Sequence, residues 1–127
     1  MSLDAINAER GLHGGTGIHG EEWLKSHHMA LARVGELLDQ GRPVIVDDTS
    51  CFRWLRDNFR KVATERGVPT TVVLLELSLE EVLARARRNE VTKERPPVME
   101  AILLDLAKGF EWPGPDENVV TVRPEDF

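Results

Sequence analysis

Two short runs of the sequence are mostly apolar, and they constrain the fold more than any other feature. Val44, Ile45 and Val46 form the first run, and residues 70–77 (TTVVLLEL) form the second. A continuous apolar run without alternation is typical of a parallel strand that is buried on both faces. Helical patterns alternate with these runs along the chain. We therefore expect an α/β fold, a parallel sheet with flanking helices.

The first run leads directly into two adjacent carboxylates, Asp47 and Asp48, which are followed by Thr49 and Ser50. Open α/β sheets place their chemistry just beyond the carboxyl ends of such strands, so this position suits a functional site. A turn explains the same residues equally well, with Ser50 as the N-cap of the next helix. The run alone leaves both interpretations open.

The spacing of apolar and turn residues predicts the other elements. Gly41 and Gly67 stand where a glycine ends a helix, and Ser78 with Glu81 forms a capping box. The predicted elements are a glycine-rich loop at 11–20, helices from Glu21 to Gly41, from Ser50 to Gly67, from Ser78 to about Asn89 and from Pro97 to Phe110, and a last strand at 118–122.

Composition limits the class of protein. The 127 residues are enough for one domain (1–127), and 41% hydrophobic with 30% charged residues is ordinary for a globular chain. The net charge of −6 argues against general nucleic-acid binding, and the single cysteine, Cys51, excludes a disulfide within the chain. Because no run reaches membrane-spanning length and no signal-peptide pattern occurs, we expect a cytoplasmic protein that does not bind membranes.

The histidines and tryptophans show no spacing typical of a metal site or a nucleic-acid surface. We expect them to be packing or surface residues, and we assign no metal ligand. They are His13, His19, His27, His28, Trp23, Trp54 and Trp112.

The order of the motifs resembles that of the P-loop kinases of the polynucleotide-kinase and zeta-toxin type. The matching blocks are LDAINAERGL (3–12), GRPVIVDDTS (41–50) with FRWLRDNFRKVATERGVPTTVVLLEL (52–77), SLEEVLARARRN (78–89) and RPPVMEAILLDLAKGFEWP (95–113). Their order and spacing are more specific than any one block. The resemblance implies a P-loop NTPase fold and an ATP-dependent, Mg²⁺-dependent transfer of phosphate to a hydroxyl of a nucleotide, polynucleotide or small metabolite.

One feature of that family does not occur in these 127 residues, namely the phosphate-binding motif G-x-x-x-x-G-K-[ST]. The loop at 11–20 lacks the lysine and a preceding strand, so it does not replace the motif. The chain corresponds to the family without its first β–P-loop–α unit. ATP and Mg²⁺ then bind only if another segment supplies the phosphate-binding unit, or they do not bind to this chain.

In the family, the P-loop strand lies between the strands that match 44–46 and 70–77. Without it, two strand edges are left unpaired, which is unfavourable. We expect a homodimer, a complementing P-loop segment or a repacked sheet to satisfy these edges. A simple monomer is the outcome that we expect least.

The resemblance assigns the general base to Asp4, which would take the proton from the acceptor hydroxyl. The family has an arginine one turn later where this chain has Asn7, and Arg10, one further turn along, partly compensates as a substrate-binding residue. Apart from the resemblance, Asp4 is equally well explained as the N-cap of a helix at 5–10.

The resemblance also gives Asp48 a catalytic role, the orientation of the acceptor. It places Asp47 near the metal or its water, and Asp47 and Thr49 are assigned to substrate binding. The competing interpretation is again the turn described above.

Arg85 and Arg88 match arginines of the family's lid, which here spans residues 85–97. In the family they close over ATP and stabilise the transferred phosphoryl group, because planar guanidinium donors suit phosphate oxygens. Arg95, in the same segment, is assigned to substrate binding. The alternative is a solvated helix face whose arginines pair with neighbouring glutamates.

The sequence therefore predicts a small kinase-like phosphotransferase domain with a small-molecule or nucleotide substrate, inactive or incomplete without a P-loop. The alternative from another class is a non-catalytic kinase relic that binds or regulates through a partner or a homodimer. A third possibility is that the chain is a piece of a longer kinase.

Overall fold

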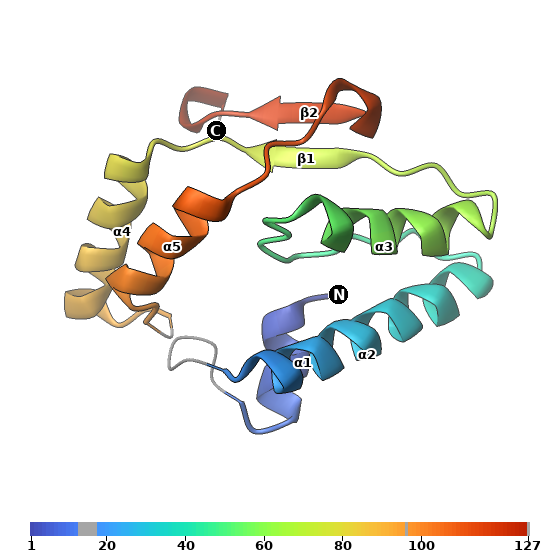
Figure 1. Cartoon of the computed structure of the whole chain (residues 1–127), viewed down its shortest axis with the longest axis horizontal. Coiled ribbons are helices and arrows are strands. Elements are labelled where there is room, and N and C mark those ends of the chain that lie inside the picture. Colours follow the sequence, from blue (N-terminus) through green and yellow to red (C-terminus); the bar gives the residue numbers. More distant parts are fainter. Residues whose placement is uncertain (13–17, 96, 127) are drawn as a thin grey trace.

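The structure is a computed structural model that describes residues 1–12, 18–95 and 97–126 (Figure 1). Its elements in chain order are α1 (Leu3–Glu9), α2 (Gly20–Asp39), α3 (Arg53–Thr64), β1 (Val72–Leu75), α4 (Leu79–Thr92), α5 (Glu100–Gly109), β2 (Val119–Val122), and the short 3₁₀ helices η2 (Pro115–Glu117) and η3 (Pro124–Asp126).

A parallel pair of strands confirms the prediction of a mixed α/β chain with a parallel sheet. β1 pairs with β2 in a register that runs from Val72 opposite Val119 to Leu75 opposite Val122. Among the described residues, this sheet has two strands. Both strands lie within the predicted runs at 70–77 and 118–122, and β1 is shorter at each end.

The run at 44–46 is not a regular strand and does not join that sheet, so its prediction as a strand of the sheet is wrong. It is an extended segment whose partner is the N-terminus. Asp47 N–H donates to Met1 C=O (2.9 Å), Leu3 N–H donates to Asp47 C=O (3.2 Å), and the Met1 amine donates to Ile45 C=O (2.9 Å). A parallel bridge joins Ser2 to Asp47. The N-terminal partner ends where α1 begins at Leu3, so the pairing is limited to a single bridge and no regular strand forms.

The packed core lies among α1, α2 and α3. Leu3 and Ile6 of α1, Ala30 and Val34 of α2 and Phe59 of α3 are buried together. The half-buried Val44 and Val46 pack against the same cluster from the extended segment. These helices form because their apolar residues recur at helical spacing, and burial of that face stabilises them.

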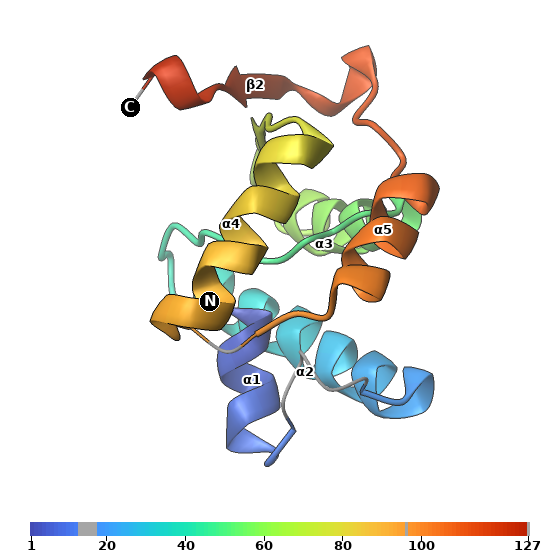
Figure 2. The ribbon, with the colours of Figure 1, turned by 90° about the vertical axis from the view of Figure 1, so that its left-hand side faces the viewer.

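Helices α4 and α5 lie apart from this core, next to each other, as Figures 1 and 2 show. Every residue of both helices is at least partly exposed. Ile102 and Leu106 of α5 and its C-cap, Phe110, are half-buried.

Two predicted helix starts are wrong. The helix after residue 50 begins at Arg53 with Phe52 as N-cap, because Ser50 has φ 43° and its side chain bonds to Asp48. The helix predicted from Pro97 begins at Glu100.

Other helix ends follow the sequence closely. Gly41 (φ 74°) and Gly67 (φ 69°) are in the left-handed conformation that favours glycine after a helix. Ser78 caps α4 by accepting from Glu81 N–H at 3.2 Å. The helix then continues to Thr92, three residues beyond the predicted end.

Part of the predicted glycine-rich loop, residues 13–17 with His13, lies outside the described residues. In the described part of the chain, no helix combines the length and apolarity that a membrane span requires.

Candidate functional site

The bridge between Ser2 and Asp47 brings the predicted acids to one edge of the molecule. Asp4 follows the N-terminal segment and Asp48 follows the run at 44–46, and these two segments are direct parallel neighbours. The carboxyl ends of adjacent parallel segments meet at the same edge. Asp4 lies exposed in the first turn of α1.

The N-cap of α1 is Ser2, whose side chain accepts from Ala5 N–H at 3.4 Å. The alternative interpretation of Asp4 as an N-cap is therefore wrong. A carboxylate in the first turn still stabilises the helix by interacting with the positive end of its dipole. Asp4 therefore has a structural role in addition to the predicted role as general base.

Asp48 is half-buried and holds the turn that follows it. Its Oδ2 accepts from the Ser50 N–H (3.1 Å) and from the Ser50 hydroxyl (2.8 Å). The turn interpretation of this acid is thus correct for its local geometry, and the predicted orientation of an acceptor remains a prediction. Asp47 and Thr49 are exposed beside it, and Thr49 lines the cavity described below.

Arg10 is the predicted substrate-binding residue that the structure ties most firmly to the protein. Its guanidinium donates to the Glu22 C=O (2.6 Å) and to the Ser26 hydroxyl (2.7 Å), and it forms an ion pair with the Glu22 carboxylate. These contacts hold the end of α1 against α2, so Arg10 positions the acid-bearing helix in addition to any contact with substrate.

His27, predicted from the sequence to be a packing or surface residue, is buried. Its ring stacks on Trp23 (centroids 5.5 Å apart) and meets Phe59 edge-on (5.3 Å). Nε2 lies 3.1 Å from the Asn58 side chain, whereas the buried Nδ1 has no hydrogen-bond partner among the described residues. Burial lowers the pKa of His27, and the negative charge of Asp48 opposes that shift. His27 is therefore neutral at physiological pH.

Asn7, which stands where the family has an arginine, is also buried. Its Oδ1 is a second buried side-chain atom without a hydrogen-bond partner in the described part of the chain. Sequence reasoning treated Asn7 as a departure and did not identify it as a polar group in the core.

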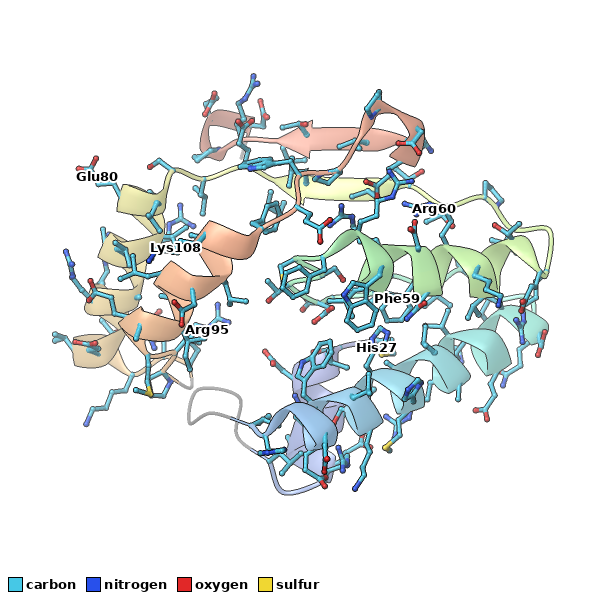
Figure 3. All side chains as sticks on the ribbon, viewed as in Figure 1. His27, Phe59, Arg60, Glu80, Arg95 and Lys108 are labelled. Atoms are coloured by element: carbon cyan, nitrogen blue, oxygen red, sulfur yellow. The ribbon has the colours of Figure 1, made fainter. Side chains whose placement is uncertain are left out.

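The predicted lid arginines lie on and after α4. Arg85 pairs with Glu81 at 2.9 Å, Arg88 is exposed, and the Arg95 backbone exchanges two hydrogen bonds with the Asn89 side chain. Figure 3 shows Arg95 on the α4–α5 side and His27 between α2 and α3. Among the described residues, no ion pair or hydrogen bond joins these arginines to the acids.

Glu117 is a site that sequence reasoning missed. Its fully buried carboxylate accepts from Arg56 Nε (2.8 Å), Arg56 Nη2 (3.2 Å), Arg60 Nη2 (2.8 Å) and Gly114 N–H (2.8 Å). The Arg56 guanidinium, foremost among these donors, lowers the pKa of Glu117 to about 2. About sixty residues separate the partners, so no local pattern could have revealed the cluster. It joins α3 to the segment before β2.

A cavity of about 760 Å³ lies between the two parallel pairs, and we call it the slot. Residues 44–46 border it on one side and residues 72–74 on the other. Side chains of α2 and α3 also line it, namely Val34, Leu38, Phe59 and Ala63.

The described residues supply no P-loop cradle for ATP, because the motif G-x-x-x-x-G-K-[ST] does not occur in the sequence. Charged side chains of both signs lie at the slot: Arg42, Asp48, Arg56 and Arg60 line it. Glu76, which follows β1, is paired with Arg123 at 3.0 Å. The described residues also contain no cluster of three His, Cys, Asp or Glu side chains that could hold a metal ion.

Comparison with models of protein families identifies a family for this chain. A family model described as an AAA domain, of the P-loop NTPase class, matches residues 5–113, a range that runs from α1 to the end of α5 and beyond. A search of curated proteins found no relative.

Proposed function

The chain belongs to this AAA domain family of P-loop NTPases, and from that premise we propose that it is the acceptor-binding part of an ATP-dependent phosphotransferase. Its substrate is a hydroxyl of a nucleotide, a polynucleotide or a small metabolite. Asp4 takes the proton from this hydroxyl, Asp48 orients the acceptor, and Arg85 and Arg88 stabilise the charge of the transferred phosphoryl group.

One observation carries the proposal. The bridge between Ser2 and Asp47 puts Asp4 and Asp48 at the carboxyl ends of two neighbouring parallel segments. A general base and an orienting acid must reach the same hydroxyl, and this edge is where two such side chains can converge. The half-buried contacts of Arg10 with α2 fix the helix that carries Asp4.

The same domain is incomplete without a phosphate-binding unit. Backbone N–H groups and a lysine of a P-loop supply most contacts to the β- and γ-phosphates in P-loop enzymes. The 127 residues contain no such motif. We therefore propose that phosphate transfer by this chain requires a segment that brings that unit.

The second candidate function is a binding or regulatory protein that has lost catalysis. The ion pairs of Arg85 with Glu81 and of Arg87 with Glu100 favour it, because they are the contacts of a solvated helix face. The two candidates differ in whether the acids bind an acceptor.

ATP binding by the chain alone is the first test. We expect titration calorimetry with Mg-ATP to give a Kd weaker than about 1 mM, because the 127 residues contain no P-loop motif to bind the β- and γ-phosphates. Micromolar affinity would contradict this expectation and reveal a nucleotide site elsewhere in the chain.

Acceptor binding is the second test. Nucleosides, oligonucleotides with a free 5′-hydroxyl and small polyols are titrated into ¹⁵N-labelled chain, and we expect one class to shift amide resonances of Asp4, Asp48 and Arg10. Asp48→Asn should weaken that binding about tenfold, because a neutral amide orients a hydroxyl less strongly than a carboxylate. It should cost at most about 1 kcal/mol of stability, since the amide oxygen can still accept from Ser50.

The matched control is Asp105→Asn on the exposed surface of α5, which should leave binding unchanged. If no class of acceptor shifts these resonances, the acids are structural and the binding-protein alternative holds.

A further inference from the structure

The loop that carries Asp48 contains an uncommon backbone conformation. Ser50, two residues after the acid, has φ 43°. Residues other than glycine rarely adopt this left-handed conformation, because their Cβ atom crowds a neighbouring carbonyl oxygen. Such a conformation persists only where the surrounding contacts hold it. The contacts of Ser50 therefore decide where the Asp48 carboxylate lies.

All three polar groups of Ser50 have a partner. Its N–H and its hydroxyl donate to Asp48 Oδ2, at 3.1 and 2.8 Å. Its C=O accepts from Arg56 Nη1 at 2.8 Å. From the first turn of α3, Arg56 thus holds the residue that in turn holds Asp48.

The other donors of Arg56 fix its guanidinium. Nε and Nη2 donate to the two carboxylate oxygens of Glu117, at 2.8 and 3.2 Å. Both residues are buried, and they are 61 positions apart in the chain. Because a guanidinium is planar, a carboxylate that binds Nε and Nη2 also fixes the direction of Nη1. The segment before β2 therefore sets how Arg56 meets the Ser50 carbonyl.

A second contact from the same part of the chain holds this loop. The Glu111 N–H donates to the C=O of the buried Cys51 at 2.8 Å. Two successive carbonyl groups, at positions 50 and 51, are thus bound by groups outside the loop. The place of Asp48 depends on α3 and on the segment after α5 together.

These contacts order Asp48 without using up its carboxylate. Oδ2 accepts both bonds from Ser50, and within the described residues no hydrogen bond or ion pair reaches Oδ1. Arg56 binds the loop through a carbonyl and directs its charge to Glu117. An ionised carboxylate oxygen has lone pairs for further donors, so Oδ1 can accept from the hydroxyl of an acceptor.

We propose that Arg56 is a positioning residue for Asp48. Held by Glu117, it keeps the Ser50 carbonyl in place and so maintains the strained turn that presents Asp48 to the acceptor. Arg56 itself touches no reacting atom. The inference rests on the proposed function for the acceptor, whereas the dependence of the loop on Arg56 can be measured without one.

The first test compares two arginines of α3 by hydrogen exchange. Arg56 and Arg60 both donate to Glu117, and of the two it is Arg56 that contacts Ser50 (Arg60 is labelled in Figure 3). A lysine at position 56 has a single nitrogen, so it cannot bind the carboxylate and the carbonyl as the arginine does. We expect Arg56→Lys to speed exchange of the Ser50 N–H at least about tenfold, relative to the Val34 N–H in the core.

Arg60→Lys is the matched control. It alters the same buried carboxylate but leaves the contact with Ser50 intact, so the relative exchange of the Ser50 N–H should change less than about twofold. Normalisation to Val34 removes any general loss of stability that either variant causes.

The second test asks whether Arg56 acts through the strained turn. Ser50→Gly retains the N–H, and glycine adopts a positive φ without crowding. In this background the loop needs Arg56 less, and we expect Arg56→Lys to speed exchange at position 50 less than about threefold. An arginine with a merely structural role would give the same factor in both backgrounds.

Acceptor probes separate this inference from the proposed function. The probes are the nucleosides, 5′-hydroxyl oligonucleotides and small polyols used above. For the class that binds, Arg56→Lys should weaken binding at least about fivefold and Arg60→Lys less than about twofold. If no class binds, the proposed function fails, and exchange at Ser50 still decides whether Arg56 positions the acid.

Equal exchange of the Ser50 N–H in Arg56→Lys and Arg60→Lys would overturn the proposal, as would equal factors in the two backgrounds. If Arg56→Lys does not fold, the wild type decides. Its Arg56 should give separate Nη resonances with nuclear Overhauser contacts to Ser50, because both ends of the guanidinium are bound. A single averaged Nη resonance would refute the positioning role.

Discussion

Four donors converge on the buried carboxylate of Glu117, and this single side chain connects α3 with the segment that leads into β2. Arg53 adds a second link to the same segment through Asp116 (2.7 and 3.0 Å). Ion pairs are poor evidence of net stability, but removal of one partner from a buried pair leaves an uncompensated charge and is strongly destabilising.

We expect Glu117→Gln to lower the free energy of unfolding by about 3 kcal/mol, because the Arg56 guanidinium would remain buried without its counter-charge. Urea denaturation measures the loss. Glu125→Gln, a change at an exposed acid, is the control and should stay within about 0.5 kcal/mol. A loss below about 1 kcal/mol in Glu117→Gln would mean that the cluster is solvated and does not join the segments.

The pH dependence of the same residue has a definite sign. The pKa of Glu117 is lowered from 4.5 to about 2, so its contribution to stability is present above pH 4.5 and is lost as the pH falls from 4.5 toward 2. We expect the melting temperature of the wild type to fall more steeply over this range than that of Glu117→Gln. Parallel curves would show that other carboxylates control acid unfolding.

His27 gives a second titration at higher pH. Burial lowers its pKa below 6.5, so the folded state holds it neutral, although Asp48 favours and His28 opposes its charged form. The unfolded state takes up the proton first, and stability is lost as the pH falls below 6.5. We expect His27→Gln to flatten the melting temperature between pH 7.5 and 5.5. His28→Gln, at the exposed neighbouring position, removes only the smallest of these three effects on the pKa of His27 and should retain most of the wild-type slope.

At the scale of elements, α4 is the helix whose stability depends most on interactions among its own residues. Its residues are all at least partly exposed, and the element that it packs against is α5. A helix with so little burial takes its stability from caps and side-chain pairs such as Glu81 with Arg85.

Ser78→Ala should therefore loosen α4 locally. Loss of the N-cap costs about 1 kcal/mol, which corresponds to about fivefold faster hydrogen exchange in the first turns of the helix. The overall melting temperature should barely change, and Ser78→Asp should restore protection because it also caps. A large drop in melting temperature would mean that α4 folds as one unit with the core.

At the scale of the whole molecule, three groups of elements pack internally: α1 with α2 and α3, α4 with α5, and β1 with β2. The slot lies between the first and the last of these groups. Free strand edges beside exposed apolar side chains tend to recruit other chains.

We expect the isolated chain to self-associate, so that the mass from light scattering rises above 14.3 kDa as the concentration increases. Val73→Lys should reduce this association, because a charge at a strand edge opposes pairing. Val91→Lys removes a more exposed apolar side chain from α4 and should have little effect. A monomer at every concentration would contradict the expectation.

The sequence alone determined the elements whose cause is local. The apolar run at 70–77 contains β1, Gly41 and Gly67 end their helices, and Ser78 caps α4, because each depends on neighbours within a few residues. It also led to the family, through the order of motifs over nearly the whole chain, which the match to residues 5–113 supports.

Only the tertiary structure decided which of these segments meet. The run at 44–46 has the composition of a central strand, yet it pairs with Met1 and Leu3 through Ile45 and Asp47, because pairing requires a neighbour and composition does not supply one. Ser50 failed as a cap since the carboxylate of Asp48 was within reach of its N–H and hydroxyl. The Glu117 cluster joins residues about sixty positions apart, and the slot arises from two borders that the chain forms separately. These features depend on distances in space, which a linear pattern does not contain.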